Sequence, residues 1–150
     1  MAPVKKSNRG RKLKYAFEQR AGTVTTNSGG NASQVLVDYS AENGVRNVKH
    51  LTLSMAYGGA AADASAIWWA IVYNPAGVTN ELLAVNNERL YEPNQYVMAC
   101  GCFDFNAGPL RVHVPTSRNL NSGDKICLLL KANSTSVSYM YTCSYAIAYN

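Results

Sequence analysis

The stretch SVSYMYTCSYAIAY, residues 136–149, alternates between mostly small or polar residues and larger apolar or aromatic ones. A period of two is the spacing of side chains along one face of a β-strand, and aromatic residues are favoured in strands. The pattern therefore predicts a long final strand in which one face carries Val137, Tyr139, Tyr141, Cys143, Tyr145, Ile147 and Tyr149.

Other segments earlier in the chain have the same β character. The run SAIWWAIVYN (65–74) is mostly apolar and ends at the turn sequence NPAG (74–77). The unbroken apolar run in KICLLLKA (125–132) predicts a strand that is buried on both faces. Further strands are predicted over 33–40, 47–58, 95–105 and 110–115.

The segment 47–58 alternates clearly enough to predict its two faces. One face would carry Val48, His50, Thr52, Ser54 and Ala56, and the other would carry Lys49, Leu51, Leu53, Met55 and Tyr57. Residues 21–33 are predicted to be a linker with at most a short strand, and 118–124 a loop. Only 80–92 suits a short helix.

Seven or eight strands separated by Gly, Pro and Asn turns predict an all-β fold. We expect an antiparallel two-sheet sandwich over residues 21–150. A single jelly roll is the favoured form, because eight strands with long connecting loops suit the 130 residues of this segment. An immunoglobulin-type sandwich is the alternative.

The composition favours a protein that buries surface against copies of itself. Of the residues, 47% are hydrophobic, only 15% are charged, and ten are Tyr. Soluble domains usually carry about a quarter charged residues, and Tyr is enriched at interfaces. A Tyr-rich monomer is the alternative.

No pattern in the sequence indicates catalysis, a metal site or a cofactor. The two histidines, His50 and His113, are too few and too far apart for a His-based metal site, and each is expected to face the core or an interface. Asp104 and Asp124 are expected to cap turns, with a cation site as the alternative. We expect buried thiols, with metal binding as a minor alternative, at Cys100, Cys102, Cys127 and Cys143.

The excess positive charge of the chain lies in residues 1–20, which form the predicted basic arm. This segment has seven Lys or Arg and one Glu, a net charge of +6, whereas residues 21–150 have seven and eight, a net charge of −1. Such an arm is expected to bind nucleic-acid phosphates without sequence preference, although a solvated tail and a nuclear import signal are other readings. The candidate nucleic-acid-binding residues of the arm are Lys5, Lys6, Arg9, Arg11, Lys12, Lys14 and Arg20.

The chain is expected neither to enter a membrane nor to be secreted. No apolar run reaches the roughly 18 residues of a transmembrane helix. The first residues, MAPVKKSNRGRKLK, also lack the apolar region of a signal peptide.

Three segments together resemble capsid proteins of small circular, Rep-encoding single-stranded DNA viruses, a circovirus-like group. They are IWWAIVYNPAG (67–77), LYEPNQYVM (90–98) and SRNLNSGDKI (117–126). The resemblance implies a single viral jelly roll, a small icosahedral shell of about 60 copies of the chain, and an arm that faces packaged single-stranded DNA. It also implies that body cations such as Arg46 and Lys49 assist the arm, and that the protein resides in the virion and in the nucleus during assembly.

Three other readings remain open from the sequence. One is the coat protein of a small RNA satellite virus, which would share the fold and the arm. The others are a monomeric nucleic-acid-binding protein and a jelly-roll module that binds glycans. No motif identifies a host receptor.

Overall fold

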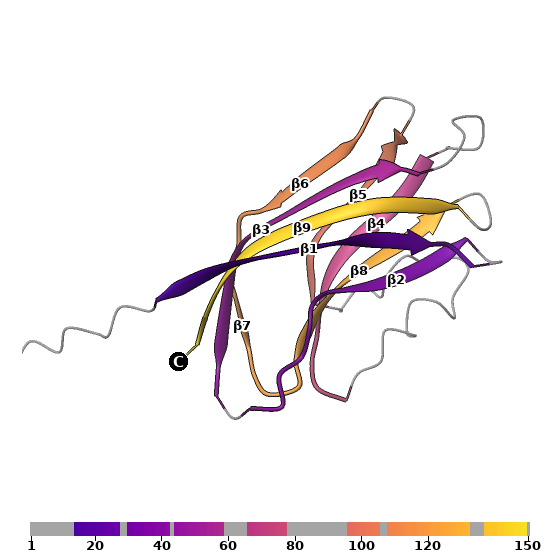
Figure 1. Ribbon diagram of the computed structural model, residues 1–150. Helices are drawn as coiled ribbons and strands as arrows, with labels where there is room; N and C mark the ends of the chain where they lie inside the picture. The colour runs from indigo at the N-terminus through magenta and orange to yellow at the C-terminus, as the bar shows by residue number, and fades with distance from the viewer. Residues whose placement is uncertain are drawn as a thin grey trace, which may run out of the picture.

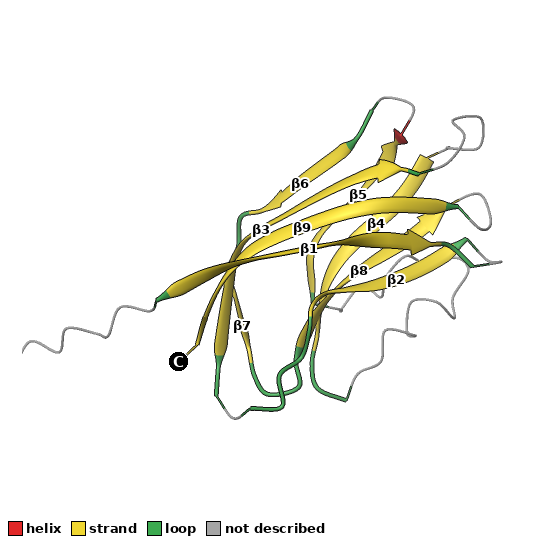
Figure 2. Cartoon of the chain, in the orientation of Figure 1, coloured by secondary structure: helices red, strands yellow, loops and turns green. Residues whose placement is uncertain are grey.

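The protein folds as two antiparallel β-sheets packed face to face (Figures 1 and 2). The computed structural model describes residues 14–27, 30–42, 44–58, 66–77, 96–105, 108–132 and 137–149. The first sheet contains, in order, β1 (Tyr15–Thr25), β9 (Ser138–Tyr149), β3 (Arg46–Tyr57) and β6 (Leu110–Val114), and β7 (Arg118–Leu120) also pairs with β3. The second contains β2 (Asn31–Val37), β8 (Lys125–Ala132), β4 (Ala66–Asn74) and β5 (Val97–Asp104).

The strand pairing identifies a jelly roll. β1 pairs with β9, β2 with β8, β3 with β6, and β4 with β5, all antiparallel, as in one long nested hairpin. This hairpin is rolled up so that β9 also pairs with β3 and β8 also pairs with β4. The prediction of a two-sheet antiparallel jelly roll is confirmed, and the immunoglobulin-type alternative is excluded because its sheets group the strands differently.

Strand β9, the stretch that opened the sequence analysis, lies between β1 and β3 in the first sheet. Its alternate residues from Tyr139 to Ile147 share one face, as predicted, and that face is buried in the core between the sheets. Tyr149, at the end of the strand, is 59% exposed.

Strand β8 lies between β2 and β4, and both of its faces are buried, as predicted. Ile126, Leu128 and Leu130 pack in the main core. On the opposite side of the sheet, Cys127 and Leu129 form a second apolar cluster with neighbours on β4. A central strand with apolar side chains on both faces has a continuous apolar sequence, which explains why the unbroken apolar run predicted this strand.

The prediction for the faces of β3 is wrong at one end because the strand contains a β-bulge. Opposite β9, the register shifts between Lys49 and Thr52, and His50 has a φ of 55°. An extra residue reverses the alternation of side chains. As a result Val48 is buried on the same side as Leu51, whereas Lys49 and His50 both lie on the opposite side.

The sequence did not predict β1 or β7. Residues 15–20 had been assigned to the arm and 21–33 to a linker, but β1 pairs with β9 from Tyr15 to Thr25. Val24 is the one residue of β1 that is buried, so the strand lacks an apolar period and forms through backbone pairing. β7 lies within the predicted loop 118–124, and the predicted helix over 80–92 lies outside the described residues.

Two of the four cysteines are buried and two are exposed. All four lie in described strands, and no disulfide joins any of them. Cys127 and Cys143 are buried, as expected. The expectation is wrong for Cys100 and Cys102, which are exposed. Both lie on β5, an edge strand, on the side opposite the main core.

Candidate nucleic-acid interface

The basic segment joins the jelly roll at the edge of the first sheet. Lys14 is exposed and directly precedes β1, which is the outermost strand of that sheet. The other predicted cations of the segment lie outside the described residues, namely Lys5, Lys6, Arg9, Arg11 and Lys12. The cationic run is therefore connected to the folded domain through β1.

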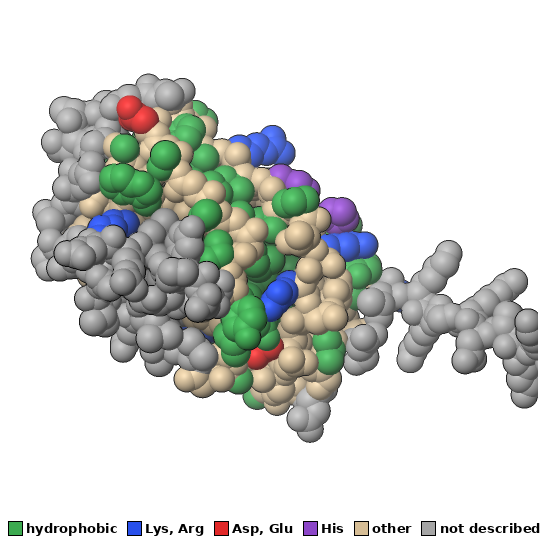
Figure 3. All heavy atoms as spheres, turned by 180° about the vertical axis from the view of Figure 1, so that it is seen from behind, with side chains coloured by type: hydrophobic (Ala, Val, Ile, Leu, Met, Phe, Trp, Pro, Cys, Tyr) green, Lys and Arg blue, Asp and Glu red, His purple; other side chains and the backbone are tan. Residues whose placement is uncertain are grey.

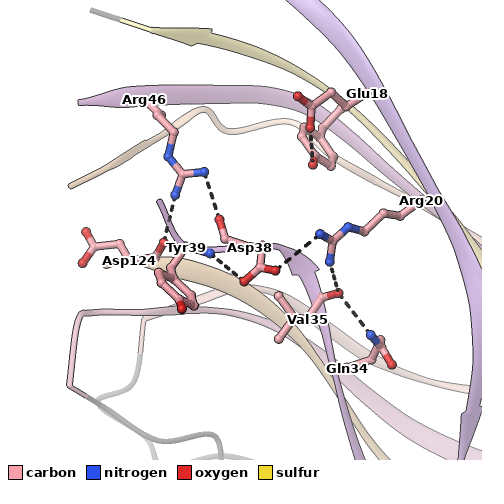
Figure 4. Close-up of polar contacts among 9 residues, drawn as sticks. Glu18, Arg20, Gln34, Val35, Asp38, Tyr39, Arg46 and Asp124 are labelled. Atoms are coloured by element: carbon pink, nitrogen blue, oxygen red, sulfur yellow. Dashed lines mark hydrogen bonds and ion pairs between the residues drawn. The ribbon is translucent and has the colours of Figure 1, made fainter. Parts of the chain in front are cut away.

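Arg20 lies within β1 and connects the edges of the two sheets (Figure 4). Its Nη1 donates a hydrogen bond to the backbone carbonyl of Val35 at 3.3 Å, and its Nη2 lies 3.6 Å from Asp38 Oδ2. The side chain keeps 37% of its surface exposed. Because its charge already faces a carboxylate, Arg20 has less to offer a phosphate than a cation on an open surface.

Arg46 was predicted to bind nucleic acid, and the structure corrects this assignment. The residue is 7% exposed, and its guanidinium donates to the backbone carbonyls of Asp38 at 2.9 Å and Asp124 at 3.1 Å (Figure 4). These bonds connect β3 to the ends of β2 and β8. Arg46 therefore holds the two sheets together and is not available to a ligand at the surface.

Asp124 is the centre of this buried polar cluster, and it caps a turn as predicted. Its carboxylate accepts hydrogen bonds from the Tyr73 hydroxyl, from the Ala76 backbone N–H at 2.9 Å and from the Asn121 backbone N–H at 2.8 Å. Burial alone would raise the pKa of this carboxyl, but the hydrogen bonds and the nearby Arg46 outweigh burial and lower it. Burial, together with the bond to Asp124, raises the pKa of Tyr73 to about 12.

Lys49 lies on the side of the first sheet that faces away from the second sheet, here called the outer face. Its Nζ sits 3.7 Å from the centroid of the Tyr15 ring, and the Tyr15 hydroxyl donates to Asn47 Oδ1 at 2.7 Å. Register places Lys49 opposite Ala146, so no large side chain from β9 covers it. Of the two predicted body cations, Lys49 is the one that remains partly exposed.

The outer face carries cations and histidines without a carboxylate among the residues that the structure describes there. Its basic side chains are Lys49, His50, Arg111 and His113. Glu18, the acid of β1, points to the other side and accepts a hydrogen bond from the Tyr145 hydroxyl at 2.8 Å. Most of the remaining outer-face positions hold small residues, such as Ala21, Thr23, Ser54, Thr142, Ser144, Ala146 and Ala148.

His50 and His113 are exposed on this face and do not face the core, so the other expectation, that they face an interface, stays a prediction. Phe17 is on the same face and is 82% exposed, whereas the Tyr15 ring contacts Lys49. The sequence signal for this surface was the absence of Asp and Glu on the polar face of 47–58, but the bulge concealed which residues belong to that face.

The second sheet presents a different surface. Figure 3, seen from behind, shows hydrophobic side chains over this sheet and few charged ones. Trp68 is 42% exposed there, opposite Cys102 on β5 and Lys131 on β8. Lys131 is the cation beside Trp68, whereas the outer face of the first sheet carries both Lys49 and Arg111.

The fold is similar to chains in solved structures of viruses. "Turnip yellow mosaic virus" aligns over 99% of this chain and 87% of its own chain, at 13% identity and a TM-score of 0.44. "Mud crab tombus-like virus" aligns over 97% and 94%, at 6% identity and a TM-score of 0.48. The "decameric BFDV capsid protein" aligns over 93% and 99%, at 10% identity and a TM-score of 0.43.

No protein-family model matches the sequence, and no curated protein matches it. The strand pairing, and not these distant likenesses, identifies the fold as a jelly roll. Within the described ranges, no helix has the length and apolar character needed to span a membrane.

Proposed function

We propose that this chain is a viral capsid protein, structural and non-enzymatic, that assembles into a T=1-like icosahedral shell of about 60 copies. The shell packages circular single-stranded DNA, the protein resides in the virion, and assembly takes place in the nucleus. One observation carries the proposal: a run of six cations ends at Lys14, and the first strand of a jelly roll begins at Tyr15. A polyanion-binding segment is thereby joined directly to a domain with few charges.

The exposed apolar side chains support self-assembly. Tyr39 is 61% exposed, Tyr96 56% and Met140 53%, and Trp68 and Tyr149 are also exposed. Large apolar side chains on a monomer surface mark protein–protein contacts, and aromatic residues and Met are enriched at such interfaces. Burial of these side chains between neighbouring subunits would supply the driving force for shell formation.

The arm supplies the affinity for the genome. Six Lys or Arg side chains within ten residues neutralise phosphates and release counterions, and this binding weakens steeply as salt rises. The arm thus reduces the self-repulsion of the packaged strand and couples assembly to nucleic acid. In the folded domain, Arg20 and Lys49 remain candidates for contacts with nucleic-acid phosphates. The contact of Arg20 with Asp38 makes its expected contribution to binding the smaller one.

Assembly is tested by negative-stain microscopy and light scattering of the expressed full-length protein. Closed particles of uniform size are expected. A monomer at every salt concentration would refute the capsid proposal and favour a monomeric nucleic-acid- or glycan-binding module. Extraction of the particle contents, followed by treatment with deoxyribonuclease or ribonuclease, then distinguishes a DNA virus from an RNA satellite virus.

The packaging role is tested with an arm-neutral chain, in which Lys5, Lys6, Arg9, Arg11 and Lys12 are replaced by Gln. Substitution is preferable to removal of residues 1–20, because such a deletion would remove half of β1 and its pairing with β9. Arm-neutral shells are expected to form but to contain little nucleic acid, as read from the ratio of absorbance at 260 and 280 nm. Lys131→Gln, on the other sheet, is the matched control and should package normally.

A further inference from the structure

The outer face of the first sheet has the charge pattern of a polyanion-binding surface. Lys49, His50, Arg111 and His113 come from two neighbouring strands, β3 and β6, and no described carboxylate faces them. A surface of one sign of charge attracts oppositely charged ligands and raises their association rate. The exposed Lys14, which ends the arm, precedes the same sheet, so the surface is continuous with the arm along the chain.

A bulge in β3 brings the two histidines together. His50 has a φ of 55°. Residues other than Gly seldom adopt this backbone conformation, although His adopts it more readily than most. The bulge turns His50 to the same side as Lys49, next to His113 on β6. The two imidazole rings are stacked, with centroids 6.3 Å apart and planes inclined by 20°.

His113 also has a fixed partner on one of its nitrogens. Its Nδ1 lies 3.1 Å from Thr52 Oγ1, which can donate to or accept from that nitrogen. A protonated imidazole donates from both nitrogens. In that state Nδ1 of His113 would donate to Thr52 Oγ1, and the Nε2–H would be left to donate to a ligand. Both histidine side chains are exposed, which makes them accessible to such a ligand.

The aromatic residues beside these charges indicate nucleic acid as the occupant. Phe17 is 82% exposed on β1, and the Tyr15 ring carries the Lys49 ammonium on its face. Single-strand-binding surfaces combine cations that follow the backbone with aromatic side chains on which bases stack. A sulfated polysaccharide would use the cations but gain nothing from an exposed Phe.

We infer that the outer face of the first sheet is a second binding surface for single-stranded nucleic acid, continuous with the arm, whose affinity rises when His50 and His113 become protonated. The inference rests on the proposed function and specifies which surface of the folded domain contacts the strand. Histidine is the side chain that changes charge between about pH 5 and pH 8. The pair is therefore the part of this surface whose charge can respond to pH.

The neighbouring charges determine how protonation and binding are coupled. The charged groups that face the pair are Lys49 from β3 and Arg111 from β6, and β1 and β9 present uncharged side chains there. A phosphate bound on this face would interact more favourably with a charged imidazole than with a neutral one, so binding of nucleic acid and uptake of protons are linked.

The test measures binding of a fluorescent oligo(dT) to full-length arm-neutral subunits by anisotropy at fixed salt. Oligo(dT) is chosen because its base does not titrate in the acidic range. At about 0.1 M salt each added phosphate contact contributes about 0.7 to log K, so one or two charged histidines should raise affinity by roughly 5- to 25-fold between about pH 7.5 and about pH 5.5. Calorimetry in buffers of different ionisation enthalpy is expected to show proton uptake on binding.

Three variants identify the surface. His50→Asn, which tolerates the positive φ, combined with His113→Gln should remove the pH dependence and the proton uptake. His113→Gln alone keeps the test valid if the double variant fails to fold, and it should remove part of both effects. Lys49→Gln with Arg111→Gln should weaken binding at both pH values, whereas Lys131→Gln should have no effect.

Two results would overturn the inference. The first is pH-independent binding by the arm-neutral chain, or an unchanged pH dependence in the histidine variants. The second concerns the ligand: if Phe17→Ser leaves oligo(dT) affinity unchanged and dextran sulfate binds as tightly as oligo(dT), the face is a general polyanion surface. Either result leaves the capsid proposal intact when full-length chains still assemble and package nucleic acid, so the two failures are distinguishable.

Discussion

Replacement of Asp124 by Ala should destabilise the domain more than any single hydrogen bond would suggest. The carboxylate joins three parts of the chain, because it accepts from Tyr73 at the end of β4, from Ala76 in the following turn and from Asn121 before β8. It is also close enough to Arg46 for that cation to lower its pKa. The substitution leaves three donors without their acceptor.

The burial of each donor sets the expected magnitude. Tyr73 is 9% exposed, so loss of its partner should cost about 1–3 kcal/mol. The N–H groups of Ala76 and Asn121 belong to exposed residues, where water can replace the carboxylate, and each should cost about 1 kcal/mol or less. The sum is about 3 kcal/mol, which for a domain of this size lowers Tm by roughly 6–12 °C.

The assay is thermal unfolding of the soluble subunit followed by circular dichroism. Tyr73→Phe, which removes one donor and keeps the carboxylate with its two backbone partners, should cost about 1 kcal/mol. The double variant should lose less than the sum of the two, by about 1 kcal/mol, because both single variants remove the same bond. Asp124→Asn serves as the isosteric variant without the charge.

The pH dependence provides an independent check. Because the pKa of Asp124 is lowered in the folded protein, its ionised form contributes stability above its unfolded pKa of about 3.9, and that stability is lost as the pH falls through the folded pKa. The Tm difference between wild type and Asp124→Asn should therefore shrink in acid. Tyr73, with its pKa raised to about 12, contributes stability below about pH 10 that is lost as the pH rises toward 12.

The reasoning would be refuted if Asp124→Ala lowered Tm by no more than Tyr73→Phe does. Strict additivity in the double variant would show that the Tyr73–Asp124 bond contributes nothing of its own. A Tm difference between wild type and Asp124→Asn that stayed constant down to about pH 2 would show that the charge of the carboxylate is not what stabilises the cluster.

Three further predictions follow from packing. In the soluble subunit the two cysteines of β5 should react with a thiol reagent at once, whereas Cys127 and Cys143 should react only on unfolding, because both are buried and burial raises the pKa of Cys143 to about 12. Gly123→Ala should lower Tm by several degrees, since Gly123 has a φ of 85° and an added Cβ would lie 2.7 Å from the Ala76 Cβ; an unchanged Tm would contradict the turn geometry. Leu53→Ala should cost about 2–5 kcal/mol in chemical denaturation, and a loss below about 1 kcal/mol would mean that the site does not lie in the main core.

Strands with a clear apolar period could be predicted from the sequence, and strands without one could not. β8 is buried on both faces and has an unbroken apolar run, and β9 is buried on one face and alternates. Each pattern therefore identified its strand. β1 buries only Val24 and exists because its backbone groups pair with those of β9 along eleven residues. Backbone pairing has no residue-specific signature, so a strand of this kind is invisible to periodicity.

Among the candidate binding residues, too, some features could be predicted from the sequence and others could not. The charge excess before Tyr15 was evident from residue counts, because charge is additive along a chain. The role of Arg46 was not, because it depends on the backbone carbonyls of Asp38, after β2, and of Asp124, which precedes β8 and is distant in sequence. The outer face depends on a single bulge, which moved Lys49 and His50 to one side of the sheet.

The sequence by itself determined that this chain is all-β and that a basic segment precedes a nearly neutral body, since composition and periodicity are local properties. Only the tertiary structure decided where the basic segment ends, which cations are buried in the polar cluster around Asp124 and which histidines share a face. These features depend on strand register, and register is set by contacts between residues far apart in the chain.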